Sequence, residues 1–148
     1  MQPSYKHYLK IIRNTCTGHE RPVTIPSEEL ADLARLAEDH CTVPFVLSSF
    51  RGTPFYPSML QRTRSMMLNY YQIDQFTRHT VSLLEDNGID CILLKGISLA
   101  SCYPVPEYRK LGDLDLYISQ KSDVSKAQKL LEANGYIAEN ELSDHHLT

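Results

Sequence analysis

The chain of 148 residues is 42% hydrophobic and 22% charged, a composition typical of one globular domain without compositional signs of disorder. Its formal net charge of −3 gives no overall attraction to nucleic acids or anionic membranes, so any nucleotide must be held by a local site. No apolar stretch approaches the roughly 20 residues of a membrane-spanning helix, and the N-terminus lacks the apolar core of a signal peptide. The cysteines have no CxxC spacing, which predicts reduced thiols in a cytoplasmic protein: Cys16, Cys41, Cys91 and Cys102.

The first third of the chain predicts short helices separated by prolines. Apolar positions favour a helix over residues 5–14, followed by a loop or hinge over 15–26. Ser27 is a candidate N-cap for a second helix that ends near residue 40 and has one apolar stripe, made of Leu30, Leu33, Ala34 and Ala37. The apolar segment 43–47 contains a proline and is either an extended piece or a helical turn.

A long amphipathic helix is predicted over residues 58–86, which hold no proline or glycine and repeat apolar residues every three or four positions. Asn87-Gly88 is typical of a left-handed C-terminal cap. A buried strand over 89–94, a short helix or turn over 97–102 and a second strand over 114–119 are expected to follow. The paired residues Met66-Met67 and Tyr70-Tyr71 on the long helix favour core packing over a surface that stacks nucleotides.

The last predicted helix begins at Ser122 or Asp123 as N-cap and ends at Asn134-Gly135. Its apolar face consists of Val124, Ala127, Leu130 and Leu131. A third strand is predicted to begin at residues 136–138. His145-His146 lack partners at metal-ligand spacing, which favours a flexible end over a metal site.

Two motifs carry chemistry: the Gly-x-Ser turn of Gly96 and Ser98, and the carboxylates Asp113 and Asp115. Alternate residues of a strand point to one face, so the two carboxylates project together and supply the hard oxygens that Mg²⁺ prefers. A glycine between strand and helix lets backbone N–H groups approach a triphosphate.

The nearby cations Lys95 and Arg109 are able to neutralise phosphate charge. The structural alternatives are a pair of acidic residues on an exposed strand edge, and cations that are solvated or ion-paired. Cys91 and Cys102 have no evident base beside them, which favours a buried thiol over a nucleophile.

The motifs stand in the order Lys95-Gly96-Ile97-Ser98-Leu99-Ala100, Tyr103-Pro104, Arg109 and Asp113-Leu114-Asp115-Leu116. Together they resemble the nucleotidyltransferase domains of the DNA polymerase β superfamily, and in particular a largely uncharacterised bacterial family. The resemblance covers about residues 89–137. It implies an α/β (α+β) fold with a small mixed β-sheet. We expect a helical region over 1–86 to share a core with a nucleotidyltransferase core over 87–148.

The resemblance implies transfer of a nucleoside monophosphate from an NTP to a hydroxyl on a small molecule, protein or RNA. Asp113 and Asp115 would be catalytic and hold Mg²⁺ or Mn²⁺, and the nucleotide would be bound by Lys95, Gly96, Ser98 and Arg109. No membrane partner is expected, and processive copying of nucleic acid is not expected of a short, acidic chain that lacks a recognisable nucleic-acid surface.

A third carboxylate on a later strand is usual in this superfamily. Glu139, Glu141 and Asp144 do not lie in an apolar-acidic-apolar strand pattern. We therefore expect the chain to be truncated within the catalytic sheet. The alternative function is a catalytically inactive nucleotide-sensing or protein-interaction module, for example one half of a toxin–antitoxin pair.

Overall fold

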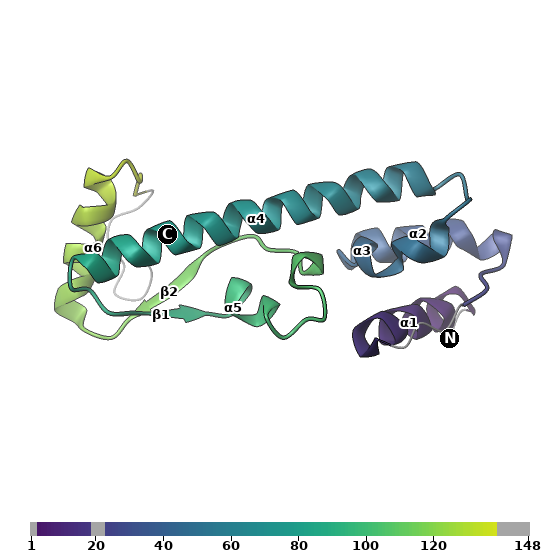
Figure 1. Ribbon diagram of the computed structural model, residues 1–148, viewed down its shortest axis with the longest axis horizontal. Helices are drawn as coiled ribbons and strands as arrows, with labels where there is room; N and C mark the ends of the chain where they lie inside the picture. Colours follow the sequence, from purple (N-terminus) through teal and green to yellow (C-terminus); the bar gives the residue numbers. More distant parts are fainter. Residues whose placement is uncertain (1–2, 19–22, 139–148) are drawn as a thin grey trace.

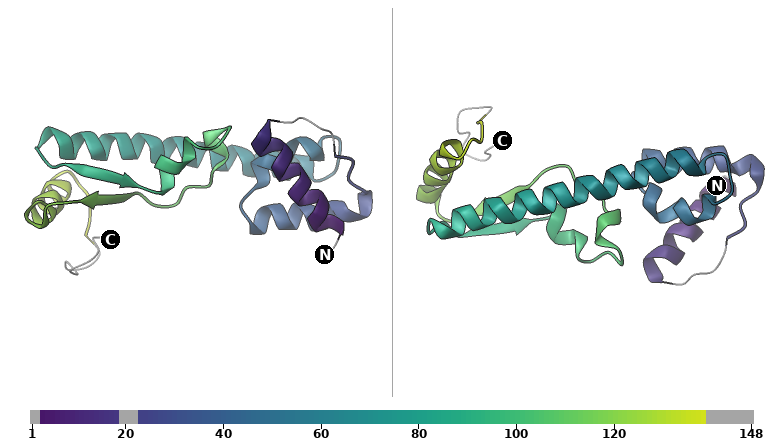
Figure 2. Two further views of the ribbon diagram at one scale, coloured as in Figure 1. Left: turned by 90° about the horizontal axis from the view of Figure 1, so that it is seen from below. Right: turned by 45° about the horizontal axis from the view of Figure 1, so that its top comes forward.

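The protein is elongated, and helix α4 (Tyr56–Asp86) runs along most of its length (Figure 1). The computed structural model describes residues 3–18 and 23–138. The N-terminal helices gather around the start of α4, whereas a β-hairpin and the last helices lie along its second half (Figure 2). Helix α4 therefore packs against both the N-terminal helices and the β-hairpin region.

The N-terminal part is a small helical bundle. Its elements are α1 (Pro3–Thr17), the 3₁₀ helix η1 (Ser27–Glu29), α2 (Leu30–Asp39), α3 (Val43–Val46) and the 3₁₀ helix η2 (Leu47–Phe50). The predicted helix over 5–14 is confirmed and extends into the expected loop, and the segment 43–47 proves to be helical. The stripe of α2 is confirmed as well: Leu33, Ala34 and Ala37 are buried together with Val46, Phe50 and Met59.

The predicted N-cap at Ser27 is wrong. Ser27 begins η1, and no side chain caps either η1 or α2. The backbone supplies the turn instead, because the Glu29 N–H donates to the Pro26 carbonyl at 3.0 Å. The Glu29 carboxylate contacts the ring of His7 on α1 at 2.7 Å, which ties the two helices together.

Helix α4 is confirmed, including its end. Gly88 has a φ of +70°, and the N–H groups of Gly88 and Ile89 donate to the carbonyls of Glu85 and Leu84 at 2.9 and 3.0 Å. This is the left-handed cap predicted from Asn87-Gly88. The helix contributes to three hydrophobic clusters in turn, through Met59 at its start, Tyr70 and Ile73 in the middle, and Leu84 near its end.

The sheet of the described residues has two strands, β1 (Cys91–Leu94) and β2 (Asp115–Ile118). They pair antiparallel, with Ile92 opposite Tyr117 and Leu94 opposite Asp115, so the mixed sheet that was expected is antiparallel here. The molecule belongs to the α+β class. The prediction of a buried strand over 89–94 is wrong for one face: Ile92 is 59% and Leu94 is 42% exposed, because no described element covers them.

The third strand predicted at 136–138 is absent from the described residues, where this segment is irregular. The Tyr136 hydroxyl lies 2.8 Å from Thr80 Oγ1 on α4, and its ring contacts that of Phe76. Ile137 is 88% exposed. Tyr136 therefore attaches this segment to α4, and the segment does not pair with a described strand.

Helix α6 (Lys121–Ala133) closes the described part of the chain. Neither predicted cap is correct, since Gln120 occupies the cap position and no side chain caps the helix. The Asp123 carboxylate pairs with Lys126 Nζ at 2.8 Å. The predicted end is confirmed, because Gly135 has a φ of +90° and donates its N–H to the Glu132 carbonyl at 3.1 Å.

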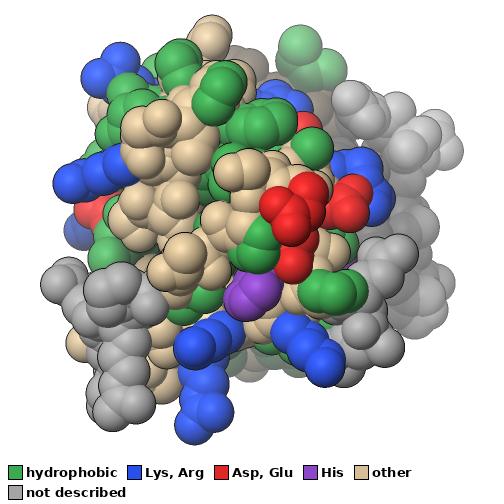
Figure 3. All heavy atoms as spheres, turned by 90° about the vertical axis from the view of Figure 1, so that its right-hand side faces the viewer, with side chains coloured by type: hydrophobic (Ala, Val, Ile, Leu, Met, Phe, Trp, Pro, Cys, Tyr) green, Lys and Arg blue, Asp and Glu red, His purple; other side chains and the backbone are tan. Residues whose placement is uncertain are grey.

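The surface at the N-terminal end carries both charge signs. Acidic side chains gather there beside a histidine, and Lys and Arg side chains are scattered around them (Figure 3). No helix of the described residues is long and apolar enough to cross a membrane. The four cysteines are free thiols.

Candidate functional site

A strained turn follows β1. Lys95 has a φ of +25° with a ψ of −141°, and Gly96 has a φ of +48°. Left-handed φ is uncommon for a residue with a side chain, so the backbone at Lys95 is held in place by its surroundings. The short helix α5 (Gly96–Ala100) starts here. A Cβ at Gly96 would lie 3.4 Å from the Asp113 carbonyl oxygen, so this Lys95–Gly96 turn packs closely on the segment before β2.

The turn brings a cation to the carboxylates. Asp115 is opposite Leu94 in the hairpin, at the end of β1 where the turn begins. The ammonium of Lys95 is 2.9 Å from Asp115 Oδ2. The hydrogen bond and charge of Asp115, with a further contribution from the charge of Asp113, raise the pKa of Lys95 above its ordinary value. Both carboxylates therefore act on the same ammonium group.

The donor set fits a hard divalent cation. Asp115 Oδ2 is inaccessible to solvent and faces the Lys95 ammonium at 2.9 Å. Asp113 is exposed. Nowhere in residues 3–18 and 23–138 do three or more His, Cys, Asp or Glu side chains form a metal-binding group. Two carboxylates suit Mg²⁺, which commonly takes one or two carboxylates and completes its shell with substrate phosphates and water.

Ser98 and Arg109 brace the turn in this structure. The Ser98 hydroxyl and N–H both donate to the Lys95 carbonyl, at 2.6 and 2.9 Å. Arg109 Nε donates to the Gly96 carbonyl at 3.0 Å, and its Nη1 donates to the Tyr103 hydroxyl at 3.2 Å. The guanidinium lies 5.6 Å from the centre of the Tyr103 ring. All four residues predicted to bind nucleotide thus meet at one turn beside the two carboxylates.

One supporting residue escaped the sequence reasoning. Asn69 on α4 donates from Nδ2 to the Leu111 carbonyl at 2.8 Å, which holds the chain two residues before Asp113. The sequence contains one indication of this contact: Asn69 is a polar residue next to Tyr70, on a helix that is predicted to pack in the core. The segment at Leu111 is irregular and its carbonyl has no strand partner among the described residues, so the Asn69 amide supplies the hydrogen bond.

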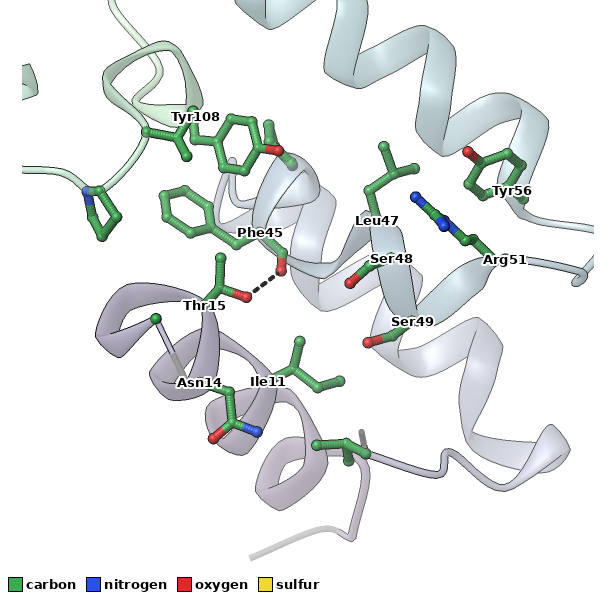
Figure 4. Close-up of a pocket in the computed structure, with 15 residues that line it drawn as sticks. Ile11, Asn14, Thr15, Phe45, Leu47, Ser48, Ser49, Arg51, Tyr56 and Tyr108 are labelled. Carbon is green, nitrogen blue, oxygen red and sulfur yellow. Dashed lines mark hydrogen bonds between the residues drawn. The ribbon is translucent and has the colours of Figure 1, made fainter. Parts of the chain in front are cut away.

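Two cavities lie where the N-terminal bundle meets the segment 103–110. The larger, about 860 Å³, lies between α1, α3, η2 and residues 104–108 (Figure 4). Thr15 forms part of its wall and donates its hydroxyl to the Phe45 carbonyl at 2.9 Å (Figure 4). The smaller cavity, about 340 Å³, includes Arg109. Phe45 and Tyr108 line both cavities.

Comparison with known proteins identifies a related family. The model of a family described as uncharacterised nucleotidyltransferases matches residues 26–148. The chain belongs to this family. The matched range includes the turn, both carboxylates and the helices from α2 onwards, so the chain contains a nucleotidyltransferase-like domain. No curated protein and no solved structure matches the chain.

Proposed function

We propose that the chain transfers a nucleoside monophosphate from an NTP to an acceptor hydroxyl, with Mg²⁺ or Mn²⁺ held by Asp113 and Asp115. One observation carries the proposal: the Lys95–Gly96 turn packs on the segment of Asp113 while its lysine contacts Asp115. The glycine turn, the Lys95 ammonium and the segment of the two carboxylates therefore lie next to one another. Membership of the family supports the general class of activity.

The turn provides the groups that a triphosphate needs. Gly96 has no side chain to keep phosphate oxygens away from the backbone. The Lys95 side chain is 65% exposed, which leaves its ammonium free to move toward a ligand. Because carboxylates raise its pKa, Lys95 is cationic at neutral pH and stabilises negative charge on the phosphates.

In the proposed reaction, the acceptor oxygen forms a bond to the α-phosphorus and the bond between that phosphorus and the β-phosphate oxygen breaks. Pyrophosphate leaves, and the hydroxyl proton passes to solvent or a basic group. Divalent ions, when bound, stabilise the charge that develops on the transferred group. Lys95 neutralises charge on the departing pyrophosphate.

The ion pair between Lys95 and Asp115 suggests an exchange of partners. The ammonium contacts Asp115 Oδ2, an oxygen that would coordinate the metal ion. We infer that Lys95 moves to the phosphates when the nucleotide and its metal arrive, which frees Asp115 for the cation. The site would then take up nucleotide and metal together.

Calorimetry of NTP binding with and without Mg²⁺ tests this proposal. Asp113→Asn and Asp115→Asn keep the shape of the side chain but remove its charge, so we expect them to abolish the strengthening by Mg²⁺. Asp86→Asn, at the exposed end of α4, is the matched control and should bind as the unchanged protein does. Mg²⁺-dependent affinity that survives in the double variant Asp113→Asn, Asp115→Asn would refute the metal role.

A second candidate function is a catalytically inactive nucleotide-sensing or protein-interaction module. It is favoured by one observation: among the described residues, no third His, Cys, Asp or Glu side chain joins Asp113 and Asp115 in a metal-binding group. Incubation with labelled NTPs, Mg²⁺ and cell extract separates the two functions. A nucleotidylated small molecule, protein or RNA supports the transferase, whereas binding of nucleotide without any labelled product supports the module.

A further inference from the structure

The smaller cavity is connected to the Lys95–Gly96 turn through Arg109. It is lined by residues of α1, the end of α2, α3 and the segment 103–110. Arg109 belongs to both places, because it lines the cavity and donates Nε to the Gly96 carbonyl at 3.0 Å. A molecule in this cavity would therefore be adjacent to the proposed nucleotide site.

The lining of the cavity is basic. Arg109, Lys110 and His40 line it, and none of its described lining residues is Asp or Glu. Lys110 has no ion-pair partner in the part of the chain that the structure describes, and the hydrogen-bond partners of Arg109 there are neutral. This concentration of positive charge in a chain of net charge −3 favours an anionic ligand.

The last turn of α2 borders the cavity, and three of its carbonyl groups accept hydrogen bonds from the backbone. The N–H groups of His40, Cys41 and Thr42 donate to carbonyls of the last turn of α2, at 3.0, 3.0 and 2.8 Å. Those carbonyl oxygens are already used by the backbone, so they offer little to a cationic ligand. Arg109, by contrast, uses two of its five N–H donors in the described contacts, which leaves donors for an oxyanion.

Three aromatic rings also line the cavity, those of Phe45, Tyr103 and Tyr108. Phe45 lies 6.0 Å from Tyr103 and 5.4 Å from Tyr108, measured between ring centres. The ring of Phe45 lies beside that of Tyr108 at the larger cavity (Figure 4), and both residues line the smaller cavity as well. A volume of about 340 Å³ is at the lower end of small-molecule sites, which favours a compact ligand over a protein or RNA.

We propose that this cavity binds the acceptor, a small molecule with a phosphate or carboxylate group and a free hydroxyl. The acceptor role rests on the proposed nucleotidyltransferase function. Arg109 and Lys110 hold the anionic group, the tyrosines contact the body of the molecule, and the hydroxyl is directed to the neighbouring turn.

Calorimetry with three probes tests the ligand class: glycerol 3-phosphate, glycerate and neutral glycerol. We expect at least one anionic probe to bind, glycerol not to bind, and Lys110→Gln to weaken the anion by about threefold or more. Lys129→Gln is the matched control, because Lys129 is exposed on α6 at the other end of the molecule (Figure 1). Binding of neither anion, equal binding of glycerol, or binding unaffected by Lys110→Gln would overturn the proposal.

A competition experiment tests the acceptor role. With a non-hydrolysable NTP analogue and Mg²⁺ present, the anionic probe should still bind to the unchanged protein. Displacement of the probe by the analogue would assign the cavity to the nucleotide and overturn the acceptor role. In Asp115→Asn, the probe should bind as before while Mg²⁺-dependent NTP binding is lost. If the unchanged protein binds the probe but no NTP, the nucleotidyltransferase proposal and the acceptor role fail, and the anion site itself is supported.

Discussion

The backbone of Lys95 offers a direct test of whether the turn is built for binding or for stability. A residue with a side chain at a φ of +25° and a ψ of −141° carries strain of about 1–3 kcal/mol. Glycine relieves that strain, although its greater freedom in the unfolded chain costs about 0.5–1 kcal/mol. Lys95→Gly should therefore be more stable than Lys95→Ala by about 1 kcal/mol, a difference of about 3 °C in melting temperature.

The two variants both remove the ammonium, so their difference reports the backbone alone. Urea and thermal unfolding followed by circular dichroism measure it, and calorimetry with Mg²⁺ and NTP should show that both variants lose nucleotide affinity. Glycine normally destabilises relative to alanine within regular structure, so the expected sign is the reverse of the usual one. If Lys95→Gly were less stable than Lys95→Ala, the turn would not be strained at this residue.

Three further predictions follow from particular contacts. Gly96→Val should lower the free energy of unfolding by about 1–2 kcal/mol, since its φ is +48°, and should reduce nucleotide affinity more than Ser98→Ala does; binding and urea unfolding measure both. Burial raises the pKa of the Cys91 thiol, so less thiolate is present at pH 8 and iodoacetamide should modify Cys91 more slowly than the exposed Cys102. Mass spectrometry measures the two rates, and equal rates would contradict this prediction. Deletion of residues 1–57 should preserve more cooperative structure by circular dichroism than deletion of 1–86, which removes α4 from all three hydrophobic clusters; a cooperatively folded chain that begins at Gly88 would contradict a shared core.

Helices were predictable where the signal is local. The stripe of α4 and the glycines at 88 and 135 identify a helix face and two helix ends, because periodicity and left-handed caps depend on neighbouring residues only. The predicted side-chain N-caps at Ser27 and at Ser122 or Asp123 are wrong, because groups near a helix start have other local partners. Asp123 pairs with Lys126 one turn later in α6, and the hydrogen bond from the Glu29 N–H to the Pro26 carbonyl forms the turn at Ser27.

Strand burial was less predictable than strand position. The apolar run ending at Leu94 predicted β1 within two residues of its start, yet it does not reveal whether a second layer covers Ile92. Tyr136 illustrates the same limit. Its aromatic ring and apolar neighbours favour a strand, but its hydroxyl bonds to Thr80 on a helix 56 positions earlier in the chain.

The residues of the candidate site were predictable from their types and spacing, whereas their contacts were not. Ser98 and Arg109 match the chemistry of phosphate binding, but both use backbone carbonyls of the turn as partners in the structure. The basic cavity combines residues near position 40 with the segment 103–110. Only the packing of the bundle against that segment creates it, so no local pattern could have predicted it.

These contacts connect the strained turn to the proposed chemistry. Glycine is expected to strain the backbone at this position less than lysine does, and water weakens the pair of Lys95 with Asp115 from the lysine side, where the side chain is 65% exposed. Neither the backbone conformation nor the ion pair therefore gives a stability reason for a lysine at position 95. A cation that must leave Asp115 for a phosphate benefits from a weak initial pair, because a strong pair would oppose the exchange. The geometry of Lys95 therefore supports a binding role for the turn, in which Ser98 and Arg109 maintain the backbone while the ammonium changes partner.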